Sequence, residues 1–294
     1  MTEIMLGDNL PILRSLPDCS FALIYIDPPF NTGAVRRRSL TRAIRDDSPE
    51  ARPRFGGRTY REVLRSDAAS MAFDDAFDDY LAFLEPRLVE ARRLLTPTGS
   101  FFLHVDPRES HYCKVLLDAI YGRASFMNEI IWAYDYGARP RSRWPAKHDV
   151  ILWYAADPAQ YTYNYDQIDR VPYMAPRLVG PEKAARGKTP TDVWWHTIVS
   201  PTGKEKSGYP TQKPLALIER IVRVHSSPGD RVLDFFAGSG TTGVAAARLG
   251  RDCLLIDSNP DAVEVCRRRL DEATTRAETL AVTDSSTPSS QARP

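Results

Sequence analysis

Residues 232–243 read VLDFFAGSGTTG, and this stretch decides the expected fold. It begins as a short apolar strand, turns through small residues and continues as a helix. Glycines in such a turn let a ligand approach the backbone at the helix N-terminus, where N–H groups are free. Asp257 ends the next apolar strand, where an acidic side chain can accept hydrogen bonds from ribose hydroxyls. The stretch therefore predicts a nucleotide-type site in an α/β fold.

The glycine turn differs from two common nucleotide-binding sequences. Residues 238–242, GSGTT, lack the third glycine of the dinucleotide fingerprint, and they lie near the C-terminus instead of opening the chain. The chain contains no G-x-x-x-x-G-K-[ST] sequence, which excludes the commonest ATP-binding loop. An adenosine-containing cofactor without a pyrophosphate suits this turn better.

Apolar segments alternate with segments of helical periodicity along the rest of the chain. The expected strands are 21–26, 100–105, 128–133, 149–154, 231–235 and 253–256, and the expected helices are 78–95, 109–121, 214–227, 241–249 and 261–270. This alternation predicts a doubly wound, mostly parallel sheet in a single catalytic domain of residues 1–272. Residues 273–294 are rich in Thr, Ser, Ala and Pro, and we expect a disordered tail.

Two irregular segments interrupt this alternation and are both basic. Residues 31–72 predict a long mobile loop, and residues 134–209, rich in Trp, Tyr and Arg, predict a recognition region in which Trp194 and Trp195 pack into the core. Ten arginines against four acids in 34–65 give +6, and three arginines and a lysine in 137–147 give +4, so the remainder of this +1 chain carries −9.

This uneven distribution of charge fits a protein that presents one basic face to a phosphate backbone. The alternative is that the two basic segments are merely solvated loops. The residues expected to contact DNA are Arg36, Arg37, Arg38, Arg139, Arg141, Arg143 and Lys147.

The motif Asp27-Pro28-Pro29-Phe30 follows the apolar run 21–26, so Asp27 is expected at the carboxyl end of a strand. Prolines lack N–H groups, which leaves neighbouring carbonyls free as acceptors beside the Asp27 carboxylate. Acceptors for both hydrogens of a conjugated amine would favour a pyramidal nitrogen with its lone pair aimed at a methyl donor. Phe30 adds a face on which a base flipped out of the duplex could stack. Taken alone, a Pro-Pro turn of this kind can also be purely structural.

The remaining residue patterns point to a soluble protein of a reducing compartment. The four cysteines form no CxxC pair and the five histidines form no metal-ligand spacing, so we expect reduced thiols and no metal. No apolar run is long enough for a membrane span, and the first ten residues do not resemble a signal peptide. We expect a cytoplasmic protein.

Together the two motifs resemble the amino-methyltransferase family of DNA-modifying enzymes. The resemblance extends through Gly7-Asp8-Asn9, Lys147-His148-Asp149 and Tyr209-Pro210-Thr211-Gln212-Lys213-Pro214. Because the Asp-Pro-Pro-Phe motif precedes the glycine turn, the order resembles the circularly permuted beta class, which often forms dimers. The resemblance implies a Rossmann-like methyltransferase fold, S-adenosylmethionine as cofactor, double-stranded DNA as substrate with base flipping, a restriction-modification context and a homodimer.

The resemblance also implies roles for individual residues. Asp27 and Pro28, with Pro29 in the same turn, would hold the target amine, and Phe30 would stack on the flipped base. Asp257 would bind the ribose and Asp8 would lie near the adenine, although Asp8 alone would suggest only a turn or helix cap. The residues expected to bind the cofactor are Asp8, Thr211, Lys213, Asp234, Phe235, Ala237, Gly238, Ser239, Gly240, Thr241 and Asp257.

Three alternatives remain for the substrate and the activity. An acidic first residue in this motif usually accompanies adenine N6 methylation, but Phe30 in place of the commoner Tyr keeps cytosine N4 open. RNA and protein-amide methyltransferases carry a similar motif, yet theirs usually begins with Asn and follows the cofactor turn. A DNA-binding module without catalysis is the third alternative, and cofactor binding would separate it from an enzyme.

Overall fold

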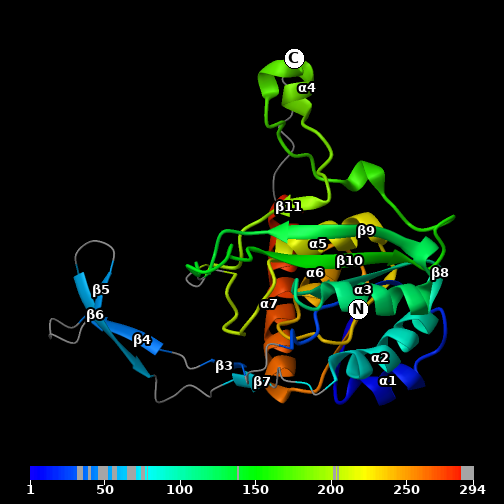
Figure 1. The fold of residues 1–294 in the computed structure, drawn as a ribbon, viewed down its shortest axis with the longest axis horizontal. Helices are drawn as coiled ribbons and strands as arrows, with labels where there is room; N and C mark the ends of the chain where they lie inside the picture. Colours follow the sequence, from blue (N-terminus) through cyan, green and yellow to red (C-terminus); the bar gives the residue numbers. More distant parts are fainter. Residues whose placement is uncertain are drawn as a thin grey trace.

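Eight strands drawn from both ends of the chain form the central sheet (Figure 1). In spatial order they are β1 (Thr2–Leu6), β13 (Asp252–Asp257), β12 (Arg231–Asp234), β2 (Phe21–Ile26), β8 (Leu95–Val105), β10 (His148–Ala155), β9 (Phe126–Ala133) and β11 (Val193–Trp195). Within this sheet β10 alone runs antiparallel to its neighbours. The expected doubly wound, mostly parallel sheet is confirmed.

The computed structural model describes residues 1–31, 36–38, 41–45, 52–54, 58–64, 71–73, 77, 79–137, 139–200, 203 and 205–285. Within 36–73 only the backbone is described. No helix in these ranges is long and apolar enough to cross a bilayer.

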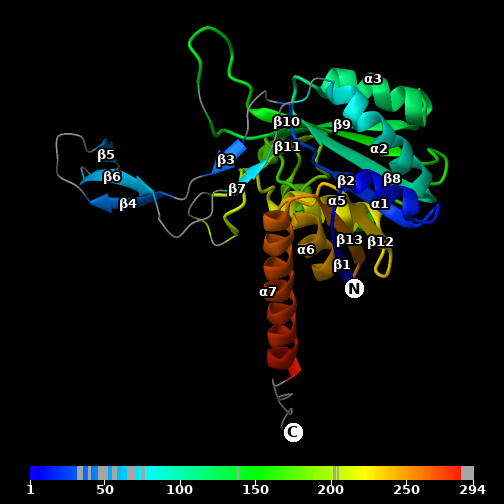
Figure 2. The ribbon, with the colours of Figure 1, turned by 90° about the horizontal axis from the view of Figure 1, so that it is seen from below.

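Helices cover both faces of the sheet in three layers (Figures 1 and 2). The helices α1 (Asn9–Ser15), α2 (Tyr80–Leu94) and α3 (Ser110–Tyr121) pack on one face, and α5 (Leu215–His225), α6 (Thr241–Arg248) and α7 (Pro260–Ser285) pack on the other. Strand β2 is buried along its whole length because Ile24 and Ile26 face the first layer while Leu23 and Tyr25 face the second. Such double burial explains why its sequence is a continuous apolar run.

The neighbouring parallel strands β2 and β12 mark the point from which successive strands are added toward opposite edges of the sheet. From β2 the chain proceeds through α2 to β8 on one side, and from β12 it proceeds through α6 to β13 on the other. Ligands of open α/β sheets bind in the crevice outside the carboxyl ends of strands at such a point. Asp27 and Asp234 lie at this crevice because each is at the carboxyl end of one of the two strands.

Several boundaries differ from the sequence-based expectations. Strand β1 was not expected, and β8 begins at Leu95 instead of residue 100, because Leu95 pairs with Phe21 before a register shift. Helix α7 continues to Ser285, so the expectation of disorder from residue 273 is wrong for residues 273–285, while 286–294 lie outside the described residues. The physical reason is that Ala, Glu, Arg and Leu recur up to residue 281 with no Gly or Pro before Pro288.

The basic segment 31–72 contains strands where the sequence predicted irregular structure. These are β3 (Arg36–Arg38), β4 (Thr41–Arg45), β5 (Arg52–Arg54), β6 (Arg58–Leu64) and β7 (Met71–Phe73). Strand β3 pairs with β7, and β4-β6-β5 form a separate small sheet that lies apart from the main body in Figures 1 and 2. Strands β4 and β6 contain Thr, Ile, Tyr and Val among the arginines, and these residue types favour strands. The mobility of this segment stays a prediction.

The segment 134–209, which was expected to form a recognition region, contains the expected strand β10 and is otherwise mostly irregular in its described part. Its short elements are the 3-10 helices η2 (Tyr165–Gln167) and η3 (Pro176–Leu178), the helix α4 (Pro181–Arg186) and strand β11. Figure 1 shows η3 and α4 projecting beyond the β11 edge of the sheet. Another 3-10 helix, η1 (Arg123–Ser125), links α3 to β9.

Candidate active site

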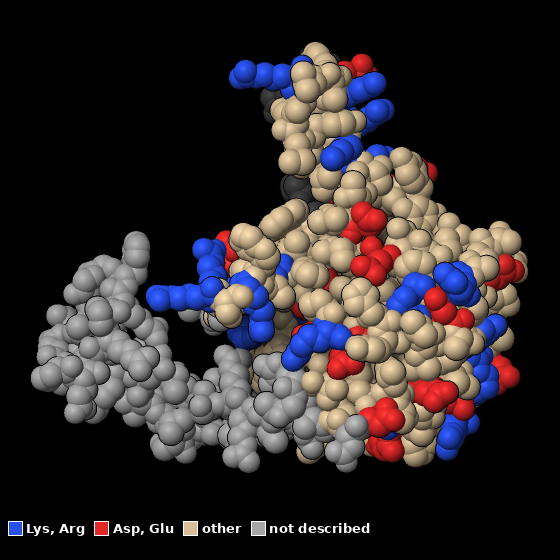
Figure 3. Space-filling model, viewed as in Figure 1, with Lys and Arg blue, Asp and Glu red and all other residues tan. Residues whose placement is uncertain are grey.

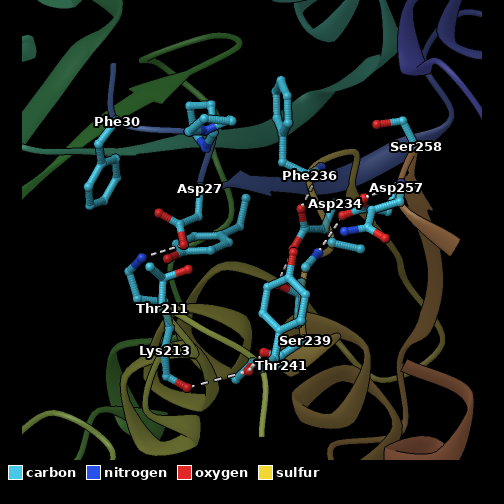
Figure 4. Close-up of a pocket in the computed structure, with 18 of the residues that line it drawn as sticks. Asp27, Phe30, Thr211, Lys213, Asp234, Phe236, Ser239, Thr241, Asp257 and Ser258 are labelled. Carbon is cyan, nitrogen blue, oxygen red and sulfur yellow. Dashed lines mark hydrogen bonds and ion pairs between the residues drawn. The ribbon is translucent and has the colours of Figure 1, made fainter. Parts of the chain in front are cut away.

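A cavity of about 460 Å³ opens at the carboxyl ends of β2, β12 and β13 (Figure 4). Its volume lies within the range of small-molecule sites, roughly 300–1,000 Å³. Asp27, Phe30 and Lys213 lie on one side of the cavity, whereas Asp234 and Asp257 lie on the other. The cavity therefore has two halves that could hold two reactants side by side.

Asp27 carries a buried acceptor that faces no donor among the described residues. One carboxylate oxygen, Oδ2, accepts from Lys213 Nζ in an ion pair, and the two side chains are 18% and 8% exposed. The other oxygen, Oδ1, is buried and has no hydrogen-bond partner in the described part of the chain. A buried polar atom without a partner is costly unless a ligand supplies one. Asp27 Oδ1 is thus ready to accept from an N–H group of a ligand.

The turn after Asp27 is held by Asn31. Asn31 adopts a left-handed conformation with φ +53°, its Nδ2 donates to Glu109 Oε1 at 3.0 Å, and its Oδ1 accepts from the Phe77 backbone N–H at 3.2 Å. These bonds fix where the preceding Phe30 ring lies. Lys213 Nζ is 4.8 Å from the centre of that ring, a cation–π contact that places a positive charge beside it.

The glycine turn is tied to the end of β13. Gly238 and Gly240 have φ values of +50° and +71°, which L side chains rarely adopt. The Asp257 carboxylate accepts from the backbone N–H of Gly238 at 2.7 Å and of Asn259 at 2.9 Å. Burial raises the pKa of Asp257 above its usual range despite these bonds. Further hydrogen bonds donated by a ligand would therefore stabilise the ionised form of this carboxylate.

Asp234 is an almost fully buried carboxyl group. Its oxygens accept from Thr242 Oγ1 at 2.6 Å and from the Phe236 N–H at 3.0 Å. Burial raises the pKa of Asp234 to about 7, with a further contribution from the nearby charges of Asp27 and Asp257. A cation in the cavity would favour the ionised form of this carboxyl group.

The segment before α5 delivers Lys213 to the cavity. Gln212 Oε1 accepts from the backbone N–H and the hydroxyl of Ser207 at 2.8 and 2.7 Å, and its Nε2 donates to the Glu205 carbonyl at 2.8 Å. Thr211 adopts φ +58° and lines the cavity. This local network explains why the polar residues Gln212 and Lys213 are buried directly before α5, whereas Thr211 is exposed.

The charge of the lining fits a cationic ligand. Among the described residues, three carboxyl groups, those of Asp27, Asp234 and Asp257, line the cavity with one cation, Lys213. S-adenosylmethionine carries a sulfonium and an ammonium group against one carboxylate, so its net charge complements this lining. The unpartnered Asp27 Oδ1, the glycine turn and the volume all fit this cofactor with an amine beside it.

Most of the residues predicted to form the site line this cavity. These are Asp27, Pro28, Pro29, Phe30, Thr211, Lys213, Asp234, Ala237, Gly238, Ser239, Thr241 and Asp257. The remaining three, Asp8, Phe235 and Gly240, are not among the lining residues. The chain thus brings together residues that are far apart in the sequence.

The three predicted residues outside the lining have structural contacts. Asp8 caps α1, accepting from the Leu10 N–H at 3.2 Å, and forms an ion pair with Arg87 at 3.0 Å. Phe235 is buried in the core, and its carbonyl accepts from Asn9 Nδ2 at 2.7 Å. A Cβ atom on Gly240 would lie 2.8 Å from a side-chain atom on α7. Their assignment to cofactor binding stays a prediction.

Sequence reasoning missed several aromatic and polar lining residues. The lining residues that were not predicted are Tyr25, Phe77, Phe83, Tyr209, Ile218, Phe236, Thr242, Ser258, Asn259 and Pro260. Tyr25 lies inside the apolar run of β2, where nothing in the sequence distinguishes it from a core residue. Ser258 and Asn259 could have been found, because they directly follow the acid that ends β13.

The basic residues between β9 and β10 lie on an exposed loop. Arg139, Arg141 and Arg143 are exposed, and Arg139 Nη2 lies 3.1 Å from an Asp135 carboxylate oxygen. Lys147 is half-buried and donates to the Tyr136 carbonyl at 2.7 Å. Figure 3 shows basic side chains gathered over this loop. Arg36, Arg37 and Arg38 form β3, but their side chains lie outside the described residues.

The expectation that both tryptophans of β11 belong to the core is wrong for one of them. Trp195 is 77% exposed, whereas Trp194 is half-buried, with its Nε1 donating to the Thr191 carbonyl at 2.8 Å. The reason is position, because β11 is a three-residue edge strand whose alternate side chains point away from the sheet core. Trp144, in the basic loop, is 95% exposed.

Known proteins resemble this chain over most of its length. The N6/N4 methyltransferase family, described as DNA methylase, matches residues 21–268. The type II methyltransferase M.HpaI of Haemophilus parainfluenzae is 30% identical over 269 residues, which cover 92% of this chain and 74% of that protein. The DNA adenine methyltransferase YhdJ of Escherichia coli K12 is 29% identical over 278 residues, which cover 92% of this chain and 83% of that protein.

A solved structure agrees with the fold. The PvuII DNA methyltransferase, described as cytosine-N4-specific, superposes with a TM-score of 0.61 at 16% identity, and the match covers 93% of this chain and 90% of that one. At this identity the likeness shows the fold alone. Within the described residues no three potential metal-ligating side chains group together.

Proposed function

Because this chain belongs to the N6/N4 DNA methylase family, we propose that it methylates the N6 amine of adenine in double-stranded DNA. Its family makes it an S-adenosylmethionine-dependent DNA amino-methyltransferase. The observation that carries the assignment of the reacting centre is Asp27, with one buried oxygen free to accept from an amine beside the cavity for a cationic cofactor. Adenine is favoured by the acidic first residue of the motif and by the resemblance to YhdJ.

The residues that would hold the cofactor are those of the second half of the cavity. The Asp257 carboxylate is suited to ribose hydroxyls, and Asp234 would pair electrostatically with the positive charge of the cofactor. When bound, S-adenosylmethionine supplies an activated methyl group on a sulfonium. The turn at Gly238 lets the ligand lie against the backbone, since no side chain projects there.

The residues of the first half would hold and polarise the base. Asp27 Oδ1 would accept one amine hydrogen and the carbonyl of Pro28 the other, which draws the nitrogen toward a pyramidal geometry. Phe30 would stack on the base, with Lys213 beside its ring. Lys213 also holds the Asp27 carboxylate in position as an acceptor, because the two groups form a largely buried ion pair.

Nucleoside analysis tests the base assignment. Purified protein is incubated with unmethylated genomic DNA and labelled S-adenosylmethionine, and the digested DNA is analysed by mass spectrometry. We expect labelled N6-methyladenine. Labelled N4-methylcytosine would keep the chemistry and replace the base, and DNA without label would redirect the proposal to RNA or protein amides.

We propose that the exposed loop between β9 and β10 binds DNA phosphates. Replacing Arg141 and Arg143 by Ala should lower affinity at low salt and reduce the slope of log K against log salt by about 1.8, because each lost phosphate contact contributes about 0.9. A matched control replaces Arg14 and Arg123, which are 61% and 89% exposed and precede the N-terminal ends of β2 and β9, whereas the basic loop follows the C-terminal end of β9. Equal slopes for the two double variants would contradict the proposal.

The further organisation of the protein also stays a proposal. A single catalytic domain over residues 1–272 is supported by the central sheet, in which β1 from the start of the chain pairs with β13 near its end. A homodimer rests on the resemblance to the beta class, and a cytoplasmic location rests on the DNA substrate.

A further inference from the structure

A buried chain of hydrogen bonds crosses the sheet beside the cavity. Tyr25 Oη lies 2.7 Å from His104 Nδ1, and His104 Nε2 lies 3.1 Å from Asp149 Oδ2. The other oxygen of Asp149 accepts from the hydroxyl of Tyr134 at 2.9 Å. His104 is fully buried, and Tyr25 is at once a lining residue of the cavity and 2% exposed. This series of hydrogen bonds therefore begins at the cavity wall and leads away from it.

The reversed direction of β10 brings these side chains together. Tyr25 is the penultimate residue of β2 and His104 that of β8, so both lie near the carboxyl edge of parallel strands. Because β10 is antiparallel to β8, its second residue, Asp149, lies at the same edge. Tyr134 directly follows β9, which is parallel to β8. All four residues are thus at the end of the sheet where the cavity opens.

The charges along this chain decide which atoms carry protons. Burial alone would raise the pKa of Asp149, but the hydrogen bond from His104 lowers it, as do the charge of Lys213 and the hydrogen bond from Tyr134. Burial raises the pKa of Tyr25 well above its usual value, and the charges of Asp27 and Asp234 raise it further. An ionised Asp149 requires a proton on His104 Nε2, which leaves Nδ1 as an acceptor for the Tyr25 hydroxyl. The lone pairs of Tyr25 Oη can then accept a hydrogen bond from a donor bound in the cavity.

Methylation of an amine creates a proton that must leave. Transfer of a methyl group to the nitrogen gives a cationic N-methylammonium group, which becomes the neutral product only when one N–H bond breaks. Asp27 is poorly placed to keep that proton, because protonation would break its ion pair with the buried Lys213. A second acceptor at the cavity wall would avoid this cost.

We propose that Tyr25, His104 and Asp149 form a relay that removes this proton, with Tyr25 as a catalytic residue and the other two acting through it. The amine N–H bond breaks, its electron pair stays on nitrogen, and the proton bonds to Tyr25 Oη. The Tyr25 hydroxyl proton moves to His104 Nδ1, and the resulting imidazolium is balanced by the Asp149 carboxylate. This inference rests on the proposed amine chemistry, but it holds for adenine and cytosine alike.

The tautomer of His104 tests the relay without any turnover. Nitrogen-15 NMR of histidine-labelled protein, with His104→Gln to assign the signal, should show Nε2 protonated and Nδ1 free. In Asp149→Asn this preference should be lost, because the carboxylate that holds the proton on Nε2 is gone. A proton on Nδ1 in the wild-type protein would overturn the proposal, since the Tyr25 hydroxyl would then point elsewhere.

Kinetics separate the relay from a purely structural role. Tyr25→Phe should lower the single-turnover rate by about 10²-fold, the lower range for loss of a proton-transferring group, with S-adenosylmethionine affinity unchanged. The matched control is Tyr154→Phe, which also removes a buried-ring hydroxyl, here bonded to Asp118 Oδ1 at 2.7 Å and outside the cavity lining. The wild-type rate should fall in D₂O, and this isotope effect should vanish in Tyr25→Phe. A rate near wild type in Tyr25→Phe, or equal losses in both variants, would refute the relay while leaving the methyltransferase assignment intact.

Discussion

Asp27→Ala is expected to lower the single-turnover rate of methyl transfer by about 10³-fold, the usual effect of losing a preorganised hydrogen-bonding group at a reacting centre. The affinity for S-adenosylmethionine should be unchanged, because Asp27 lies across the cavity from Asp234 and Asp257. Transfer is measured by single turnover with saturating DNA, and affinity by calorimetry. Wild-type turnover in this variant would exclude the assigned chemistry.

The same substitution has a second consequence, which needs its own control. It leaves Lys213, whose side chain is 8% exposed, without its ion-pair partner, and an unpaired buried charge costs about 3–5 kcal/mol of stability. The double variant Asp27→Ala with Lys213→Met removes both charges and should regain most of this loss without regaining transfer. Asp27→Asn, which keeps the size of the side chain, should be inactive as well. Recovery of activity along with stability would show that Asp27 acts only through folding.

Gly240→Val is expected to lower the stability of the protein more than its affinity for the cofactor. A Cβ atom at this position would lie 2.8 Å from Cys266 Sγ and 3.2 Å from Cys266 Cα, and the backbone φ is +71°. A left-handed L residue costs about 1–2 kcal/mol, and overpacking costs about 1–3 kcal/mol. We expect a loss of about 2–5 kcal/mol in the free energy of unfolding without ligand, measured by urea denaturation.

Gly238→Ala is the matched control, because its glycine lies in the same turn and lines the cavity. A Cβ atom there would lie 3.2 Å from Tyr209 Cε1 and would project where a ligand must approach the backbone. We expect Gly238→Ala to weaken cofactor binding with a smaller loss of stability, about 1–2 kcal/mol from its φ of +50°. The opposite order, with Gly240→Val stable and only Gly238→Ala destabilised, would contradict this division of roles.

The sequence by itself determined the layered fold and most of the site residues. A fully buried parallel strand must be apolar on both faces, so 21–26 and 253–256 are recognisable without knowing their neighbours. Residues that directly follow such strands lie at one edge of the sheet, and this was enough to predict that Asp27 and Asp257 approach the cavity. These features are local, because each depends on a few consecutive residues.

The tertiary structure alone decided which distant groups meet. Lys213 pairs with Asp27 across 186 positions of the chain, and a pairing of that kind leaves no periodic trace in the sequence. The reversed direction of β10 places Asp149 beside His104, and thereby distinguishes Tyr25 from the core residues on either side of it. Strand order and direction are set by how whole faces of helices and strands pack. For this reason the hydrogen bonds that link Tyr25, His104 and Asp149 could be recognised only in the folded molecule. The same holds for the different roles of Gly240, which packs against α7, and Gly238, which lines the cavity.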